Sequence, residues 1–319
     1  MIIIILILVF LLSSTIYHQV KKRGEFRENP PPGERIKIGE DHLHIYGEGE
    51  GTPTLLFSSG AFSFCYGFYY KIFKELSSKY RALIYDRPGY GWSESTNRAR
   101  TMDEINKDLK ELLDKSNEEG PYILIGHSLG ATELLQFANR YPRQTAGVVL
   151  LDPAYVEEKN KVVIYLAFAV ITFLRITGIL RILVNFNIFD IYGAREIRDK
   201  YPDRIVKLTE LMFYNRGFSL NSIEEYLDLH QTFKDNEEIG EIPLLILSAE
   251  HEELRKKNKE FYQELTKHHQ ELLSLSTKSE HRMIEDADHS FPLSKPELVS
   301  KEILSFLKKI KNTGAEIQC

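Results

Sequence analysis

The strongest constraint on the fold of this chain is a regular alternation of short apolar runs with helical patterns. The runs at 54–58, 122–125 and 147–151 have the length and content of buried strands. Between them, stretches such as 102–119 repeat apolar side chains every three or four residues, as amphipathic helices do. Strands that alternate with helices predict an α/β fold, in which a mostly parallel central sheet carries helices on both faces.

The alternation is interrupted once, and the interruption divides the chain. We expect residues 35–154 and 241–319 to form the two parts of one core, and residues 155–240 to form an inserted helical cap. Residues 159–189 of the cap contain four bases and no acid, and 162–174 are nearly all apolar but too few to span a membrane. The cap should roof an apolar pocket, and its cationic, apolar surface is also a candidate for contact with an anionic membrane.

The N-terminus has a separate character, because residues 1–20 carry no charged side chain and are nearly all apolar. About 20 such residues span a bilayer as a helix, so we predict an uncleaved membrane anchor. A cleaved signal peptide is the alternative, with a weak cleavage site at 13–15. The bases at 21–23 place the rest of the chain on the cytoplasmic side by the positive-inside rule, whereas cleavage would lead to secretion. Residues 21–34 are expected to be a basic, proline-rich linker, in which 29–33 end the helix.

Composition excludes several classes of protein. The chain carries 41 basic and 46 acidic side chains, a net charge of −5, whereas a protein that binds the nucleic-acid backbone usually has a basic excess. Two cysteines cannot form a disulfide framework or a cysteine-rich zinc site. The sequence implies no metal and no organic cofactor.

The motif richest in chemistry is Gly126-His127-Ser128-Leu129-Gly130, which lies between an apolar strand and a helix. In such a sharp turn the nucleophile has a strained backbone, and the two glycines allow close packing where a Cβ would clash. The Ser128 hydroxyl would then project from the sheet edge at a helix N-terminus. We therefore interpret Ser128 as a catalytic nucleophile.

A serine nucleophile needs a histidine base and a carboxylate that orients it. Of the ten histidines, His289 is the best placed, because it lies in the loop between the last predicted strand and the last predicted helix. That loop returns to the sheet edge beside the elbow and keeps the chain order of nucleophile, acid and histidine. Two acids follow strands, Asp152 after 147–151 and Glu252 after 244–247, and the residues alone leave both open.

Four stretches together resemble the α/β-hydrolase family. They are the loop at 59–62, the run Asp86-Arg87-Pro88-Gly89-Tyr90-Gly91-Trp92-Ser93, the elbow at 126–130 and the loop at 285–292 that bears His289. The resemblance spans about residues 35–310 apart from the cap. It implies the fold strongly and says little of the substrate. Asp86 and Arg87 would belong to a hydrogen-bonded loop near the site.

The resemblance also implies the remaining site residues. The oxyanion-hole donors map to the N–H groups of Leu129 and Ala61, with Phe62 as the fallback, although serine replaces the usual histidine at the start of that loop. Asp152 is favoured as the acid over Glu252, because branches with an acid at the earlier position have a glycine five residues before it. Branches with an aspartate nucleophile, such as dehalogenases and epoxide hydrolases, do not fit Ser128.

We therefore expect a membrane-anchored serine hydrolase that cleaves a carboxylic ester, or a related acyl bond, with a hydrophobic moiety through an acyl-enzyme. Its partners would be a small hydrophobic ester and the membrane, and no nucleic acid. Two other activities stay open: an acyltransferase on the same fold, and a non-catalytic protein that binds or signals through the pocket. A peptidase is not excluded.

Overall fold

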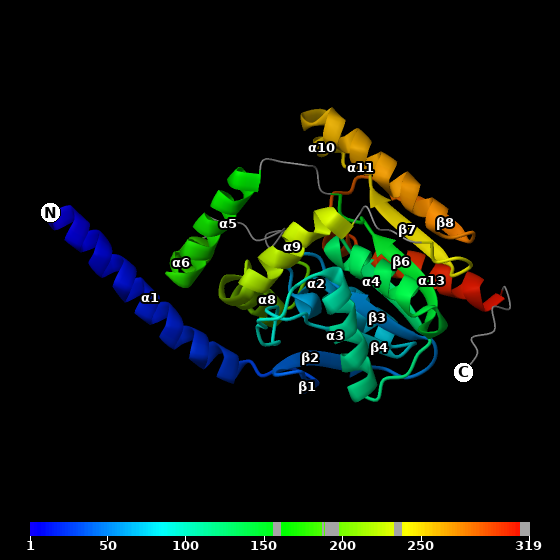
Figure 1. Ribbon diagram of the computed structural model, residues 1–319, viewed down its shortest axis with the longest axis horizontal. Helices are drawn as coiled ribbons and strands as arrows, with labels where there is room; N and C mark the ends of the chain where they lie inside the picture. Colours follow the sequence, from blue (N-terminus) through cyan, green and yellow to red (C-terminus); the bar gives the residue numbers. More distant parts are fainter. Residues whose placement is uncertain (156–160, 187, 189–197, 233–237, 313–319) are drawn as a thin grey trace.

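A computed structural model describes residues 1–319 apart from 156–160, 187, 189–197, 233–237 and 313–319. An eight-stranded sheet runs through the centre of the molecule in the order β1-β2-β4-β3-β5-β6-β7-β8 (Figure 1). The pairs β1–β2 and β2–β4 are antiparallel, and the pairs from β4–β3 onward are parallel. The strands are β1 Glu34–Ile38, β2 Asp41–Glu48, β3 Thr54–Ser58, β4 Ala82–Tyr85, β5 Tyr122–His127, β6 Thr145–Leu151, β7 Leu244–Ala249 and β8 Ser279–Ile284.

Helices cover both faces of the sheet, which confirms the predicted α/β fold. Along β5, Ile123 and Ile125 pack towards one face with α2 and α13, while Leu124 packs towards the other face with α3 and α4. The central strands are therefore continuously apolar, as strands of a parallel sheet buried on both faces must be. The core helices are α2 Cys65–Ser77, α3 Met102–Lys115, α4 Leu129–Arg140, α10 Glu252–Lys257, α11 Lys259–Leu272, α12 Phe291–Ser294 and α13 Pro296–Asn312, with short 3₁₀ turns at Pro142–Gln144 and Leu273–Leu275.

Further helices lie between β6 and β7, where the alternation of strands and helices is interrupted. They are α5 Lys161–Ile176, α6 Ile179–Asn185, α8 Asp203–Arg216 and α9 Leu220–Thr232. In Figure 1 they stand together beyond the carboxyl ends of the parallel strands. Two of the four bases expected to give this region a cationic surface turn inward instead: Arg175 donates to the Asn215 carbonyl (3.4 Å), and Arg181 is 4% exposed. Lys159 lies outside the described residues.

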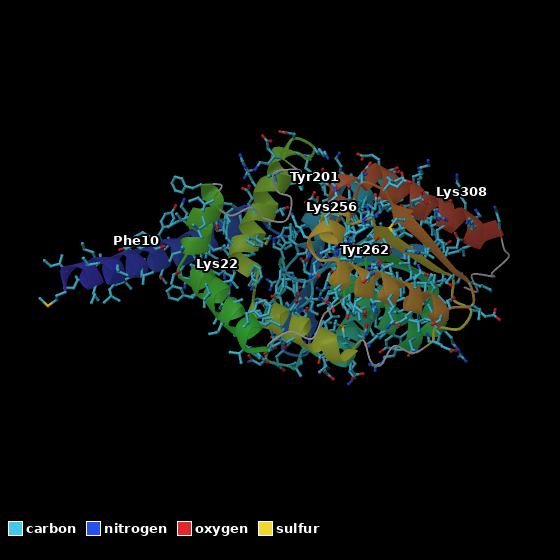
Figure 2. The ribbon with its side chains drawn as sticks, turned by 90° about the horizontal axis from the view of Figure 1, so that it is seen from above. Phe10, Lys22, Tyr201, Lys256, Tyr262 and Lys308 are labelled. Carbon is cyan, nitrogen blue, oxygen red and sulfur yellow. The ribbon has the colours of Figure 1, made fainter. Side chains whose placement is uncertain are left out.

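The N-terminal segment forms one long helix, α1 (Ile2–Glu28), which projects from the body of the molecule (Figures 1 and 2). It continues through the basic residues 21–23 expected in a linker, because nothing there breaks a helix. It ends before Asn29 and the prolines at 30–32, whose rings cannot continue the hydrogen-bond pattern. Within the described residues, α1 is long and apolar enough to cross a membrane, and the bent pair Val162–Ile176 and Ile179–Asn185 passes the same test only when taken together.

The second half of α1 is docked on the cap rather than free. Glu25 pairs with the buried guanidinium of Arg181, and one of its oxygens also accepts a hydrogen bond from the Asn215 amide (3.1 Å). His18, which is 1% exposed, accepts a hydrogen bond from Arg181 through Nδ1 (3.1 Å). Gly178, at the corner between α5 and α6, lets the helices approach, since a Cβ there would lie 2.6 Å from the Cβ of His18. Helix α1 and the helices between β6 and β7 therefore form one packed unit.

Replacing Arg181 by alanine should release α1 from the cap, because it leaves the half-buried Glu25 carboxylate without its partner. Leaving one partner of a buried ion pair without the other costs about 3–5 kcal/mol, which is enough to open a local contact such as that between α1 and the cap. In detergent micelles we expect trypsin to cut at least tenfold faster at Lys21–Arg23 in R181A than in the wild type, as measured by mass spectrometry of the N-terminal fragments.

The matched control is R198A, which removes an exposed arginine paired with Glu210 on the same cap. Cleavage of R181A at the rate of R198A would contradict the docking of α1.

Candidate active site

The elbow at the end of β5 holds Ser128 in the strained conformation expected of a nucleophile. Its backbone has φ 54° and ψ −122°, a region that non-glycine residues rarely adopt. The Ser128 N–H donates to the Leu151 carbonyl at the end of β6 (3.1 Å), which pins the turn to the sheet. At Gly130, a Cβ would lie 2.5 Å from the Ser58 carbonyl oxygen, so the α4 helix can start here only with glycine.

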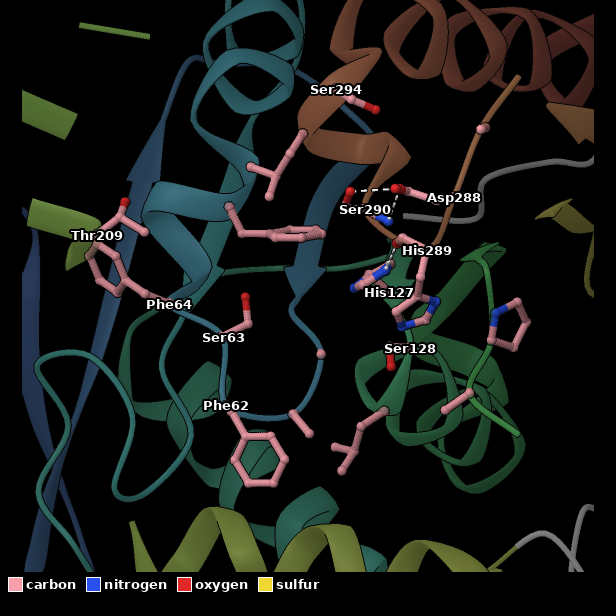
Figure 3. A pocket seen from close by; sticks show the side chains of 18 of the residues that line it. Phe62, Ser63, Phe64, His127, Ser128, Thr209, Asp288, His289, Ser290 and Ser294 are labelled. Atoms are coloured by element: carbon pink, nitrogen blue, oxygen red, sulfur yellow. Dashed lines mark hydrogen bonds between the residues drawn. The ribbon is translucent and has the colours of Figure 1, made fainter. Parts of the chain in front are cut away.

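The structure brings Asp152 and His289 together, although 137 residues separate them. Nδ1 of His289 lies 2.6 Å from Oδ2 of Asp152. His289 is partly exposed on the wall of the cavity that also contains Ser128, and Figure 3 shows both side chains there. Asp152 is fully buried at the carboxyl end of β6, with φ 44°. His289 and Asp152 are thus hydrogen-bonded at the sheet edge where the elbow also places Ser128.

The carboxylate of Asp152 has more partners than the sequence suggested. Oδ1 accepts the Ala249 N–H (3.0 Å), and Oδ2 also lies 2.8 Å from Nε2 of His251. Burial alone would raise the pKa of Asp152, but the hydrogen bonds from His251 and His289 outweigh it and hold that pKa well below its ordinary value. The group therefore stays ionised throughout the neutral range.

Glu252, the other acid left open by the sequence, also lines the cavity but pairs with a different residue. It begins α10, on the exposed side, and its carboxylate pairs with Lys256 one turn later (2.6 Å). That ion pair lowers the pKa of Glu252 and is an ordinary i, i+4 contact on a helix surface. Within the described residues, the carboxylate that His289 contacts is that of Asp152 and not that of Glu252.

His127 supports the loop that carries His289. Complete burial and the neighbouring His289 lower the pKa of His127 to about 3, so its imidazole is neutral at physiological pH. It donates through Nε2 to the backbone carbonyl of His289 (2.7 Å), and the two rings lie 4.5 Å apart. The elbow thus holds His289 by its main chain, while Asp152 holds it by its side chain.

The residues expected to form an oxyanion hole line the same cavity. Ala61 and Phe62 form a turn after β3, in which Phe62 has φ 61°, and Leu129 begins α4. The first N–H groups of a helix have no acceptor within it, so the Leu129 N–H is suited to receive an oxyanion.

Arg87 holds this turn from behind. Its guanidinium donates to the backbone carbonyls of Ser59 (2.8 Å) and Gly60 (3.2 Å), the two residues before Ala61. Arg87 is 3% exposed and forms ion pairs with the fully buried Glu133 of α4 (3.0 Å) and Glu225 of the cap helix α9 (2.9 Å). One buried arginine therefore joins the turn at residues 59–62, the helix α4 and the helix α9. This agrees with the hydrogen-bonded loop expected at Asp86 and Arg87.

The cavity above Ser128 has a volume of about 1250 Å³ and an aromatic roof. Phe62 stacks on Phe218 with ring centroids 4.4 Å apart, and it also contacts Phe168 of α5 and Tyr226 of α9. Phe62 and Tyr226 line the cavity, whereas Phe168 and Phe218 contact Phe62 and are not part of the lining. The cavity therefore offers an apolar surface to whatever part of a ligand lies next to Ser128.

His251 is the site residue that the sequence did not single out. It lies in the segment Ala249-Glu250-His251 after β7, with φ 53°, and its contact with Asp152 depends on that left-handed turn. A histidine among three acids gave no signal of its own. Asp152, His251 and His289 have ligand atoms within 4.8 Å of one another and so could hold a metal ion. A metal ion bound there would replace the hydrogen bonds that His251 and His289 form with Asp152.

A family model described as serine aminopeptidase, S33, matches residues 53–288, and the chain belongs to this family of α/β-hydrolases. An uncharacterised protein of Bacillus subtilis, YbdG, is 23% identical over 96% of this chain and 95% of its own. A thermophilic esterase from Thermogutta terrifontis superposes with a TM-score of 0.66, at 21% identity over 87% of this chain and 99% of that one. A putative lipase from Acinetobacter baumannii gives 0.65, at 20% identity over 93% and 97%.

These comparisons identify the chain as a hydrolase of the α/β-hydrolase fold. At such low identity, the likeness to solved structures speaks for the fold and not for the substrate.

The two histidines on Asp152 can be separated by mutation. His289→Phe should abolish hydrolysis, whereas His251→Phe should reduce kcat/KM by about tenfold and lower the free energy of unfolding by about 1.5–3 kcal/mol, since it removes a hydrogen bond to a charged group. Ester hydrolysis and urea unfolding of both variants measure this difference. If H251F lost as much activity as H289F while staying folded, His251 would be the better candidate for the base.

Proposed function

We propose that this protein is a serine hydrolase that cleaves a carboxylic ester, or a related acyl bond, with a hydrophobic moiety. The observation that carries the proposal is the hydrogen-bonded pair of His289 and Asp152 on the wall of an aromatic-roofed cavity that contains Ser128. A buried carboxylate held ionised beside a histidine is what a serine nucleophile requires of its base.

In the proposed reaction, Ser128 Oγ attacks the carbonyl carbon while Nε2 of His289 takes its proton. The N–H groups of Ala61 and Leu129 then stabilise the tetrahedral oxyanion, each by a few kcal/mol. His289 returns the proton to the leaving alcohol, and an acyl-enzyme remains. Water attacks that ester with His289 as base, which releases the acid and restores the Ser128 hydroxyl. Asp152 stabilises the imidazolium in both steps.

The pocket supports a hydrophobic acyl or alcohol group. Phe62, Phe64, Phe68 and Tyr226 line the pocket and provide contact area without charge, and each fully buried CH₂ of a substrate gains about 0.8 kcal/mol. The same acyl-enzyme could pass its acyl group to an alcohol or amine instead of water, and product analysis with an added acceptor separates a transferase from a hydrolase.

We also propose that α1 is an uncleaved membrane anchor, with the catalytic domain on the cytoplasmic side. Its first 20 residues have the length and hydropathy of a membrane span, and three bases follow them. The docking of residues 18–25 on the cap supports a mature protein that retains this helix. Intact mass spectrometry of the purified protein distinguishes it from a processed, secreted form.

The first test of the activity is a series of p-nitrophenyl esters of increasing chain length. We expect kcat/KM to rise with each added CH₂ by up to about fourfold, the equivalent of 0.8 kcal/mol, until the cavity is filled. Ser128→Ala should abolish turnover and labelling by a fluorophosphonate probe. Folded wild-type protein that takes up no label would instead favour a non-catalytic binding protein.

The acid is tested by a pair of neutral, near-isosteric substitutions. Asp152→Asn should lower kcat on the best ester by a factor on the order of 10⁴, as loss of the acid does in serine–histidine–aspartate enzymes. Glu252→Gln removes an exposed charge and should leave kcat within about twofold. Circular dichroism shows whether both variants are folded, and a reversal of these two effects would contradict the assignment.

A further inference from the structure

The outer face of α5 is a continuous apolar stripe that the described part of the chain leaves exposed. Val163, Leu166, Val170 and Phe173 recur at three- and four-residue spacing and are 50–62% exposed. No charged residue lies between 162 and 174. The opposite face of α5 is occupied, since Phe168 contacts the pocket roof and Ile171 and Leu174 pack on the cap core. Apolar stripes of this kind mark contact sites with a membrane or another protein.

We propose that this stripe lies in the membrane interface, so that α5 is a second, monotopic contact with the bilayer. The proposal rests on the anchor proposed for α1. The proposed partner of this stripe is the acyl chains of the lipids rather than another protein, and three further observations support that choice.

The first observation is orientation. In two views related by a 90° turn, α5 crosses α1 rather than running along it (Figures 1 and 2). A helix that crosses a membrane-spanning helix lies in the plane of the bilayer, as interfacial helices do. The helices α5 and α6 also bend by 81° at their junction, so the pair does not form one straight span.

The second observation is depth. The corner at Gly178 packs against Ser14 and His18 of α1. With a rise of about 1.5 Å per residue, that contact lies about 3–9 Å inside the end of a span that finishes at residue 20. Interfacial helices bury their apolar face to about 5–10 Å, so the position of α5 along α1 matches the depth that such a helix needs.

The third observation is the direction of the charges. Arg175 and Arg181 point inward, to the Asn215 carbonyl and to Glu25, and neither is offered to lipid head groups. The contact should therefore depend on apolar burial and not on anionic lipid, contrary to the cationic surface expected from the sequence.

Tryptophan fluorescence in the full-length protein tests this proposal. The native Trp92 is 4% exposed and bonded to the Asn29 carbonyl, so it gives a constant background. In vesicles of phosphatidylcholine with brominated acyl chains, we expect the added emission of Leu166→Trp to fall at least twofold relative to unbrominated vesicles. Val170→Trp repeats the measurement one turn away. Lys308→Trp, on the exposed side of α13, should be unaffected.

Ile7→Trp in α1 separates the two proposals. If Ile7→Trp is quenched and neither Leu166→Trp nor Val170→Trp is, the anchor holds and the α5 contact is overturned. A second copy of this chain covering the stripe would give the same result. If Ile7→Trp is not quenched either, the anchor fails as well. Quenching at 166 that needs phosphatidylglycerol and disappears in high salt would also overturn the proposal, because the contact would then be electrostatic.

Discussion

The site depends on one buried carboxylate. Asp152 follows β6, and its two oxygens accept hydrogen bonds from the N–H of Ala249 at the end of β7, the ring of His251 and the ring of His289. Three loops at the carboxyl edge of the sheet are thereby held by a single charge. A buried carboxylate is expensive to desolvate, so it persists only because every one of these partners is present. A change that removes one of these partners should consequently disturb both the position of His289 and the fold of this edge of the sheet.

A second buried charge organises the other side of the cavity. Arg87 reaches the turn at residues 59–60, Glu133 behind the nucleophile and Glu225 on the cap. Arg100 also pairs with Glu225 (3.0 Å), so the cap helix α9 is held by two arginines of the core. The turn at residues 59–62 and the cap helix α9 are therefore held by the same buried arginine, Arg87. A displacement of α9 would be felt at the carbonyls of that turn, because packed ionic groups rearrange as a unit.

The fold and the position of Ser128 could be predicted from sequence, because both leave local signals. Strand-helix alternation fixes the sheet, and the elbow motif places Ser128 at its edge. The choice between Asp152 and Glu252 was open from the residues alone, since each follows a strand, and only the family resemblance favoured Asp152. The register of β6 beside β7 decides which carboxyl meets the histidine loop. His251 was missed for the same reason. The inward turn of Arg175 and Arg181 was likewise invisible, because it depends on Glu25 and Asn215, which are remote in the chain.

If α1 is the proposed membrane anchor, its docking on the cap determines what kind of attachment it provides. A flexible linker would let the body tumble and reach substrates at many distances. Here α1 continues unbroken to Glu28, and the contacts of Glu25 and His18 with Arg181 hold it rigidly against the cap. With the first turns of α1 in a bilayer, the rest of the protein would keep a fixed distance from the membrane surface and a fixed orientation. Its search for substrate would become two-dimensional, and only molecules that present their scissile bond at that height would be encountered productively.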